Sequence, residues 1–231
     1  MTKKSAVIVF GGTFNPVHNG HLRSATELRD RFPISQIRFM PSANPPHRDQ
    51  PQVSAEDRAT MIELAIADLE ALTCDRRELV RAGPSYTVVS LRELRQELGP
   101  KRSLTLLLGT DAFSHLNSWY RWEDIFSYAN LLVMYRPPHD TLAELVADPV
   151  ELESETLVES HANAELAERL PAEVSVDTLW QQAFGGLARV RLKPHAISST
   201  EIRALLQSGA KPHALTPPVV ADFIEDKGLY R

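Results

Sequence analysis

Two histidines three positions apart close a glycine-rich segment near the start of the sequence, Gly11–His21, which reads GGTFNPVHNGH. Glycines let a backbone approach a ligand, and a helix starting here would offer free N–H groups and partial positive charge to an anion. His18 and His21 would face the same way, where both can hydrogen-bond a triphosphate and stabilise charge on departing pyrophosphate. The plainer alternative is a tight strand–helix turn with two exposed histidines. The segment is neither the Gly-x-Gly-x-x-Gly fingerprint nor a P-loop, whose Gly-Lys-Ser/Thr ending it lacks.

A second cluster of hydroxyl and basic residues lies far along the chain, at residues 197–203, which read ISSTEIR. Ser198 with Glu201 satisfies a helix capping box, and this structural interpretation stands by itself. A capping box does not require the other polar residues of the segment, which would form a second anion cradle. These residues are Ser199, Thr200 and Arg203.

A third set of polar and aromatic residues lies in the middle of the chain, after expected strand ends or at a helix start. The segments are residues 41–48 (PSANPPHR), 84–87 (PSYT), 109–111 (GTD) and 119–122 (WYRW). Trp119 can stack on a flat heteroaromatic ring, and Asp111 suits a ribose hydroxyl. Backbone N–H groups near Tyr86, Thr87 and Tyr120 can donate to a carboxylate. The alternative for the tryptophan-rich segment is a packed aromatic corner.

Short apolar runs alternate with helical patterns and supply the elements that would position these residues. The expected strands are Ala6–Phe10, Ile37–Pro41, Ser103–Gly109, Asn130–Tyr135 and Arg189–Lys193. Several are apolar nearly throughout, as strands covered on both faces must be. The alternation predicts an α/β fold with a doubly wound parallel sheet and right-handed crossovers. Ligands of such sheets bind beyond the carboxyl ends of the strands, where the glycine–histidine segment would lie.

Apolar residues at a spacing of 3.6 predict the helices between the strands. Three stripes are Leu22, Ala25, Leu28 and Phe32; then Met61, Ile62, Ala65, Ile66 and Leu69; then Leu91, Leu94 and Leu98. Ser54 is the expected N-cap of the second helix, with Asp57 three residues on, and Gly99 closes the third. A last helix would be capped by Thr216, begin at Pro217 and end at Gly228.

The composition predicts a single globular domain over residues 1–231. Hydrophobic residues make up 43% of the chain and charged residues 24%, and no apolar run approaches the ~20 residues of a membrane helix. We therefore expect no membrane partner. Cys74 is the only cysteine, so no intrachain disulfide is expected, and the cytoplasm is the expected compartment.

The net charge of −5 is unevenly distributed. Residues 139–177 contain eleven acidic residues and one basic residue, Arg169, which gives −10 and leaves the rest of the chain near +5. That remainder suits a site for small polyanions, while no dense basic stripe predicts a nucleic-acid partner. The stretch at about 139–186 is expected to be a helical, solvated surface rather than a separate domain.

The two terminal motifs resemble the His-x-Gly-His signature and the Ile-Ser-Ser-Thr-x-x-Arg motif of the nucleotidyltransferase superfamily. With the middle segments, in order from Ala6 to Thr216, the chain looks like the bacterial nicotinate-nucleotide adenylyltransferases of NAD biosynthesis. The resemblance is weakest across 139–186. It implies a Rossmann-like nucleotidyltransferase fold with a helical C-terminal part, and ATP and nicotinate mononucleotide as small-molecule substrates.

The residues and the resemblance together predict two sets of contacts. The ATP set is Gly11, Gly12, Thr13, Phe14, His18, His21, Ser198, Ser199, Thr200 and Arg203. The nicotinate mononucleotide set is Ser42, Asn44, Tyr86, Thr87, Asp111, Trp119 and Tyr120. Some members of the family have an asparagine near the pyridine pocket, where this sequence has Ser42, with Asn44 two residues on.

The implied reaction is in-line attack of the acceptor's 5′-phosphate on the α-phosphorus of ATP, which expels pyrophosphate. A phosphate monoester is already ionised near pH 7, with a second pKa of about 6, so neither a general base nor a protein nucleophile is expected. Positioning and charge stabilisation by His18, His21 and Arg203 would carry the catalysis. Mg²⁺ would be carried by the phosphates of ATP, so no metal ligands from the protein are expected.

Other hypotheses stay open from the sequence. The acceptor could instead be nicotinamide mononucleotide or phosphopantetheine. A nucleotide-binding regulatory module without turnover is a third hypothesis, although such a sensor does not need residues that stabilise a leaving group. A fragment of a class I tRNA synthetase would need a Lys-Met-Ser-Lys-Ser-type loop and an anticodon domain, and neither is present. The sequence does not give the oligomeric state, and a homo-oligomer is compatible with it.

Overall fold

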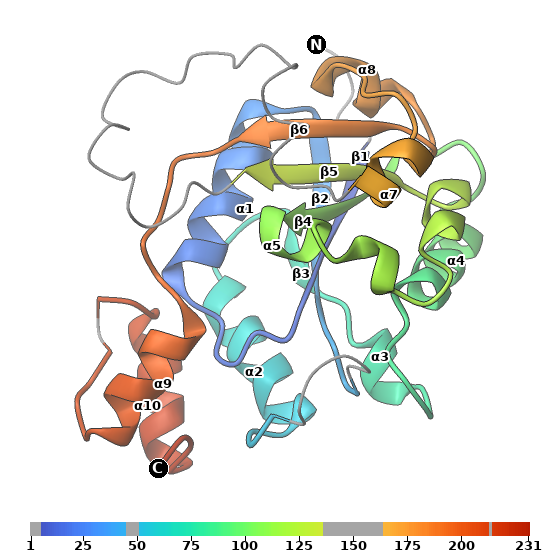
Figure 1. The fold of residues 1–231 in the computed structure, drawn as a ribbon. Helices are drawn as coiled ribbons and strands as arrows, with labels where there is room; N and C mark the ends of the chain where they lie inside the picture. The colour runs from blue at the N-terminus through green and yellow to red at the C-terminus, as the bar shows by residue number, and fades with distance from the viewer. Residues whose placement is uncertain (1–5, 45–50, 136–163, 213) are drawn as a thin grey trace. The chain divides into compact units, whose positions relative to one another are not determined.

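The computed structural model of the chain describes residues 6–44, 51–135, 164–212 and 214–231. Six strands form one parallel sheet in the order β3-β2-β1-β4-β5-β6 (Figure 1). The strands are β1 (Ala6–Gly12), β2 (Ile34–Pro41), β3 (Leu72–Cys74), β4 (Leu104–Gly109), β5 (Asn130–Tyr135) and β6 (Leu187–Arg191). The predicted α/β fold with a doubly wound parallel sheet is confirmed.

Only β5 has the predicted bounds. Strand β1 continues to Gly12 instead of ending at Phe10, β2 begins at Ile34 instead of Ile37, and β4 begins at Leu104 instead of Ser103. The last strand was expected at Arg189–Lys193, but β6 begins two residues earlier because Leu187 and Ala188 are buried and pair with β5. The short strand β3 was not predicted at all. It pairs with β2 over three residues, too few to produce a recognisable period in the sequence.

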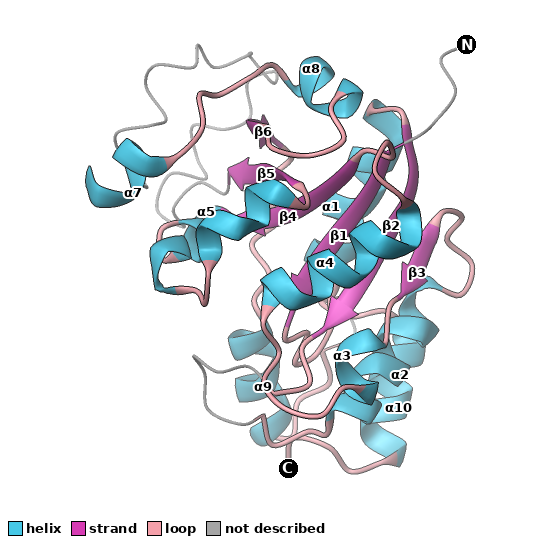
Figure 2. Ribbon diagram, turned by 90° about the vertical axis from the view of Figure 1, so that its right-hand side faces the viewer, coloured by secondary structure: helices cyan, strands magenta, loops and turns pink. Residues whose placement is uncertain are grey.

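Helices and 3-10 turns connect the strands (Figure 2). They are α1 (Asn19–Arg31), α2 (Ala55–Ile66), α3 (Arg77–Val80), α4 (Thr87–Leu98), α5 (Thr110–Phe113), η1 (Leu116–Ser118), η2 (Trp122–Ser127), α7 (Ala164–Arg169), α8 (Val176–Gln181), α9 (Ser199–Gln207) and α10 (Pro218–Asp226). Across the described ranges, none of the helices has the length and apolar character needed to cross a membrane.

The predicted helix caps are confirmed in part. The Ser54 hydroxyl accepts a hydrogen bond from the Asp57 N–H at 3.0 Å, as expected, and Gly99 with a φ of 78° ends α4. The prediction for the last helix was wrong, because Pro217 is the N-cap of α10 and Lys227 its C-cap. The buried Thr216 hydroxyl lies instead 3.4 Å from the carbonyl of Pro212.

The chain divides into two compact units, each assembled from several segments. Unit 1 comprises residues 1–10, 33–35 and 86–194, and unit 2 comprises residues 11–32, 36–85 and 195–231. The glycine–histidine and ISSTEIR motifs both belong to unit 2. The segments 109–111 and 119–122 belong to unit 1.

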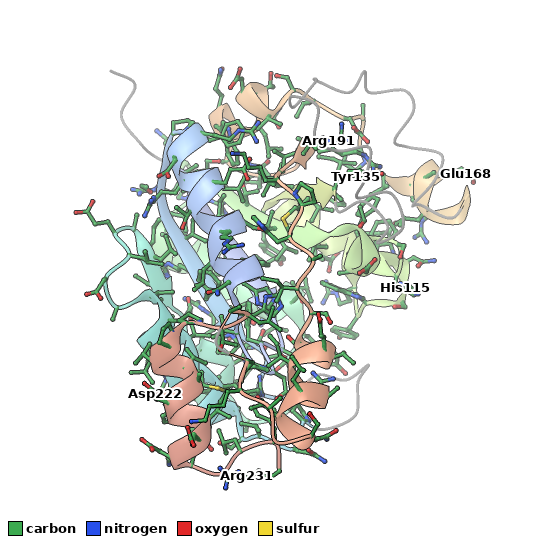
Figure 3. All side chains as sticks on the ribbon, turned by 90° about the vertical axis from the view of Figure 1, so that its left-hand side faces the viewer. His115, Tyr135, Glu168, Arg191, Asp222 and Arg231 are labelled. Atoms are coloured by element: carbon green, nitrogen blue, oxygen red, sulfur yellow. The ribbon has the colours of Figure 1, made fainter. Side chains whose placement is uncertain are left out.

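Unit 1 is built on most of β1 and on β4, β5 and β6. The residues of β4 and β5 are almost all buried, whereas Arg189 and Arg191 of β6 are partly exposed. In the view of Figure 2, α4 lies across β1, and it buries Val88, Leu91 and Leu94. At the carboxyl ends of β5 and β6, Tyr135 and Arg191 are register partners and lie side by side (Figure 3). The guanidinium carbon is 5.9 Å from the centre of the tyrosine ring.

Unit 2 contains α1, most of β2, β3, and the helices α2, α3, α9 and α10. Helix α10 packs against α2. The apolar stripes predicted for α1 and α2 are mostly buried, with Leu28, Met61 and Ile62 fully inaccessible. Phe32, which is the C-cap of α1, and Ala65 are partly exposed. Leu69, the last member of the second predicted stripe, lies beyond the end of α2.

The acidic segment is described only from residue 164 onward, and its earlier part lies outside the described residues. The described part is helical in α7 and α8, as predicted. It is not merely a solvated surface, because Leu166, Leu179 and Trp180 are buried. Arg189 also forms a 2.6 Å ion pair with Glu173.

Candidate active site

Strand β1 leads into the β1–α1 loop, Thr13–His18, which carries the centre of the first motif. At two of the glycines, close packing explains why a larger residue would not fit. A Cβ at Gly12 would lie 3.1 Å from the Phe14 ring, and a Cβ at Gly20 would lie 3.1 Å from the His18 ring. A Cβ at Gly11 would meet no protein atom within 4 Å. Packing within the protein therefore does not explain Gly11, whereas close approach of a ligand would.

The two histidines of the motif lie in contact at the start of α1. His18 is the N-cap and is buried, and His21 is the third helical residue and is partly exposed. Their rings stack with centres 3.6 Å apart. The backbone N–H of His18 donates to Nδ1 of His21 at 3.3 Å, so the neutral His21 ring carries its proton on Nε2. Phe14 packs edge-on against His21 and holds the ring in place.

The second motif is joined to the first by hydrogen bonds. The Ser199 hydroxyl donates to the Pro16 carbonyl at 3.0 Å, and Arg203 donates to the Asn15 carbonyl at 2.9 Å. Ser198 is the N-cap of α9 and accepts from the Glu201 N–H at 3.1 Å, which is one of the two bonds of the predicted capping box. The structure therefore brings the two motifs together, although nearly the whole chain separates them.

These bonds also define what Ser199, Thr200 and Arg203 do in the structure. Ser199 and Arg203 hold the loop backbone, and Arg203 additionally donates to the Thr200 hydroxyl at 3.2 Å. A guanidinium carries five N–H donors, so these two bonds leave Arg203 with further donors for a phosphate. Direct contact of the three residues with ATP stays a prediction.

Arg58 in α2 is a site residue that the sequence analysis did not identify. Its side chain is 1% exposed and donates to the carbonyl groups of Thr13, Ser42 and Val53. Burial lowers the pKa of this guanidinium. Arg58 thus fastens the β1–α1 loop to the end of β2 with one buried cation.

Tyr230 is a second residue that the sequence analysis missed. Its hydroxyl donates to the Asn15 side-chain oxygen at 2.8 Å, and its ring is buried. Burial raises the pKa of this phenol, so the hydroxyl stays protonated and able to donate. A tyrosine after a C-terminal helix gives no sequence signal for such a role, because its partner lies 215 positions away.

Two residues of the predicted acceptor set, Ser42 and Asn44, also lie in unit 2. The N–H groups of Ala43 and Asn44 both donate to the Ser85 hydroxyl at 3.0 Å, and the Ser85 N–H donates to the Asn44 carbonyl. The Ser42 hydroxyl oxygen is buried and has no hydrogen-bond partner among the described residues. Asn44 is exposed. The rest of segment 41–48 lies outside the described residues from position 45.

The other acceptor residues lie in unit 1. The rings of Tyr86 and Tyr120 stack with centres 4.4 Å apart. Tyr86 is the N-cap of α4 but supplies no side-chain cap, so the N–H groups at Thr87 begin the helix uncapped by a side chain. Trp119 is partly buried, and Asp111 is exposed in the first turn of α5. The structure thus groups Tyr86, Thr87 and Tyr120.

The comparison with known proteins agrees with these motifs. Residues 9–205 match the cytidylyltransferase-like family. Proteins named "Probable nicotinate-nucleotide adenylyltransferase" from Pseudomonas paraeruginosa and Cellvibrio japonicus are 41% and 43% identical to the chain. The first alignment covers 96% of each chain, and the second covers 96% of this chain and 97% of its relative. The chain belongs to the nicotinate-nucleotide adenylyltransferase family.

The fold is shared with a solved structure of low sequence identity. The structure of Plasmodium falciparum nicotinic acid mononucleotide adenylyltransferase complexed with NaAD aligns with a TM-score of 0.68 at 15% identity. The alignment covers 98% of this chain and 97% of that one. As a nicotinate-nucleotide adenylyltransferase family member the chain is a nucleotidyltransferase enzyme, so the predictions of family, fold and enzyme class are confirmed.

Within the described parts of the chain, no group of three or more His, Cys, Asp or Glu side chains is arranged to hold a metal ion. The candidate site of this nicotinate-nucleotide adenylyltransferase family member instead offers the Arg203 guanidinium, the His18 and His21 rings and backbone N–H groups. Such a donor set suits the oxygens of phosphate groups.

Proposed function

We propose that the chain transfers AMP from ATP to nicotinate mononucleotide, forming nicotinate adenine dinucleotide and pyrophosphate as a step of NAD biosynthesis. One observation carries the proposal beyond family membership. The two motifs that suit phosphates are hydrogen-bonded to each other, through Ser199 on Pro16 and Arg203 on Asn15. Both substrates are phosphorylated metabolites of the cell interior, so we propose the cytoplasm as the compartment.

ATP would lie against the β1–α1 loop and the starts of α1 and α9. Gly11 and Gly12 would allow close approach of the nucleotide, and the helix starts would offer N–H groups to its phosphates. His21 would donate from Nε2, because its Nδ1 is already an acceptor. His18 lies against His21 and would share the same phosphate group.

The chemistry needs no nucleophile from the protein. An oxygen of the acceptor's 5′-phosphate forms a bond to the α-phosphorus of ATP while the bond from that phosphorus to the bridging oxygen of pyrophosphate breaks. Negative charge therefore moves onto the pyrophosphate. Positioned donors that meet this charge lower the barrier, and His18, His21 and Arg203 are the residues that we assign to it.

ATP would enter as its Mg²⁺ complex. When bound, Mg²⁺ neutralises phosphate charge, and it usually keeps several waters and binds through substrate phosphates. The donor set described above fits this arrangement, because it would contact the phosphates rather than the metal.

The acceptor's pyridine carboxylate would lie at the start of α4. The helix begins at Thr87 without a side-chain cap, so its N–H groups are available to an anion. No acidic residue occurs between Arg81 and Arg92, so this part of the chain offers no carboxylate to an amide NH₂. Tyr86, Tyr120 and Trp119 would contact the ring, and Asp111 the ribose.

The test is an assay of pyrophosphate release with ATP, Mg²⁺ and one of three acceptors. We expect the highest kcat/KM with nicotinate mononucleotide, and nicotinate adenine dinucleotide as the product. A higher kcat/KM with nicotinamide mononucleotide or phosphopantetheine would overturn the acceptor assignment. Binding of ATP without pyrophosphate release with any acceptor would instead support a regulatory module.

A further inference from the structure

The backbone of the β1–α1 loop is held by side chains from two helices of unit 2. The carbonyl of Thr13 accepts from Arg58 in α2, and the carbonyl of Asn15 accepts from Arg203 in α9. The carbonyl of Pro16 accepts from Ser199, also in α9. Three of the loop's carbonyl groups therefore point toward donors of the protein.

This arrangement has a consequence for the N–H groups of the loop. A peptide group is planar and trans in most cases, so its C=O and N–H point in opposite directions. The Thr13 carbonyl points toward Arg58, and the N–H of Phe14 therefore points away from it. The Pro16 carbonyl points toward Ser199, and the N–H of Val17 therefore points away from that side chain. Loop N–H groups that point away from the protein's own donors can donate to a bound anion.

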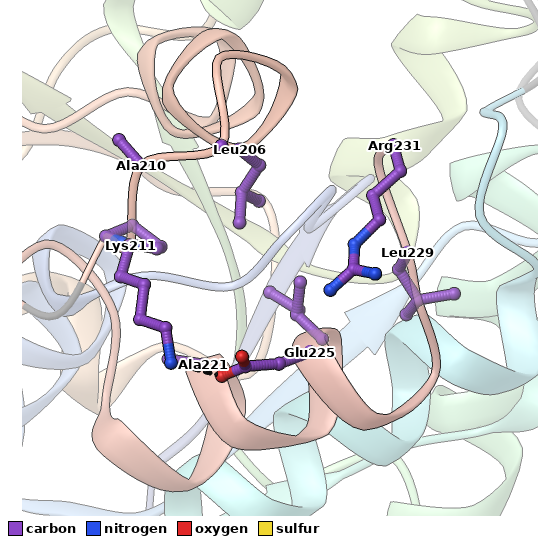
Figure 4. Close-up of a pocket in the computed structure, with 10 residues that line it drawn as sticks. Leu206, Ala210, Lys211, Ala221, Glu225, Leu229 and Arg231 are labelled. Atoms are coloured by element: carbon purple, nitrogen blue, oxygen red, sulfur yellow. Dashed lines mark hydrogen bonds and ion pairs between the residues drawn. The ribbon is translucent and has the colours of Figure 1, made fainter.

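Tyr230 holds this loop at its centre. Its hydroxyl donates to the side chain of Asn15, whose own carbonyl is the one that Arg203 holds. Tyr230 lies after α10, between Leu229 and Arg231, which line a small hollow of about 80 Å³ beside α9 and α10 (Figure 4). That hollow is far smaller than a nucleotide site, and Tyr230 is not among the residues that line it.

Tyr230 and the residue that precedes its partner Asn15 both adopt a left-handed backbone conformation. Tyr230 has a φ of 64°, and Phe14, next to Asn15, has a φ of 50°. Bulky residues rarely adopt this left-handed conformation, and it persists only where surrounding contacts enforce it. Such strain concentrates at functional sites.

We propose that Tyr230 is a positioning residue for ATP: through Asn15 it sets the conformation in which the β1–α1 loop binds the phosphates. The inference rests on the proposed function, because it takes ATP as the ligand of this loop. Tyr230 does not touch the reacting atoms in this proposal. It acts on affinity for ATP and leaves affinity for the second substrate unchanged.

The test is Tyr230→Phe, which removes the hydroxyl and keeps the ring that packs in the core. We expect KM for ATP to rise about threefold to tenfold, the size of one lost hydrogen bond, with KM for nicotinate mononucleotide unchanged. The Kd of a non-hydrolysable ATP analogue, measured by calorimetry, should rise by the same factor. All measurements are made well below the melting temperature of the variant.

Tyr128→Phe is the matched control, because Tyr128 is partly exposed and its hydroxyl makes no hydrogen bond among the described residues. It should leave both KM values unchanged. Asn15→Ala probes the same bond from the other side and should raise the analogue's Kd by a similar factor. The Kd of the analogue for the double variant should then be close to that for either single variant.

The outcomes separate the two proposals. Unchanged KM and Kd for the nucleotide in a folded Tyr230→Phe protein, with only a lower melting temperature, would overturn the positioning role. If Tyr230→Phe does not fold, a wild-type Kd in Asn15→Ala would overturn that role equally. A wild-type protein that binds the analogue but releases no pyrophosphate would refute the proposed function and leave the positioning role intact.

Discussion

The imidazole rings of His18 and His21 stack with their centres 3.6 Å apart and their planes at 25° to each other. The contact is fixed from the backbone, since the N–H of His18 donates to Nδ1 of His21. Gly20 makes room for the His18 ring, and Phe14 packs on His21 from the side. The two nitrogen atoms of His21 therefore have different roles, and this difference can be tested.

His21→Asn keeps an acceptor near the position of Nδ1 but removes the donor at the position of Nε2. We expect kcat to fall by about 10²–10³, the usual cost of one lost transition-state donor. The free energy of unfolding should change by less than about 0.5 kcal/mol. His21→Gln, whose amide reaches further, should retain more activity than His21→Asn. Equal activity of His21→Asn and the wild type would show that the ring only starts the helix.

Arg58→Lys keeps the charge but loses the planar fork that reaches three carbonyl groups. An ammonium in its place would leave buried acceptors without donors, so the free energy of unfolding should fall by about 2–4 kcal/mol, measured by urea denaturation. KM for ATP should rise as the loop loosens. The exposed Arg92 provides the control, since Arg92→Lys should lower the free energy of unfolding by less than about 0.5 kcal/mol. Equal stability of the two variants would contradict the fastening role of Arg58.

Acceptor choice should depend on Thr87 and not on Trp119. Trp119→Ala should weaken nicotinate and nicotinamide mononucleotides alike, by about 1–3 kcal/mol if stacking on bases is a guide. Thr87→Val removes a hydroxyl donor that only the carboxylate uses, so it should narrow the gap in kcat/KM between the two acceptors. Measuring kcat/KM of both variants with both acceptors tests whether Thr87 sets selectivity and Trp119 sets only affinity. A loss of selectivity in Trp119→Ala alone would reverse the assignment.

Burial raises the pKa of the Cys74 thiol to about 12, and the charge of Glu63 acts in the same direction. In the unfolded chain the thiol has a pKa of about 8.5. Above that pH the unfolded state loses a proton that the folded state keeps, so stability falls as pH rises toward 12. Between pH 8 and about 10, wild-type stability should therefore decline more steeply than that of Cys74→Ala. Native Cys74 should also react slowly with iodoacetamide, and a rate equal to that of the denatured protein would argue against burial.

The motifs and the long elements could be predicted because their signals are local. The segment Asn130–Tyr135 is apolar throughout after its first residue and is β5 to the residue. Ser54 caps α2 through an atom three residues away, which the sequence displays directly. Thr216 failed as a cap because the consecutive prolines after it move the N-cap to Pro217.

The network around the β1–α1 loop could not be predicted, for a physical reason. Arg58 lies in a helix close to acidic residues, where a charged residue normally faces water, and only tertiary contacts reveal that three carbonyl groups enclose it. In the sequence, Tyr230 likewise appears only as a residue that follows the last predicted helix. Residues that hold a distant segment in place do so through tertiary contacts. Their position in the sequence shows no pattern that links them to that segment.

The bonds from Ser199, Arg203 and Tyr230 to the β1–α1 loop span 183, 188 and 215 positions of sequence. A ribosome adds about 5–20 residues per second, so a nascent chain carries the loop for roughly 10–40 s before these partners have been made. Closing such long loops costs entropy and is slow. The loop therefore acquires the conformation that we propose for ATP binding only at a late stage of synthesis, because a chain released before Ser199 lacks all three of these bonds.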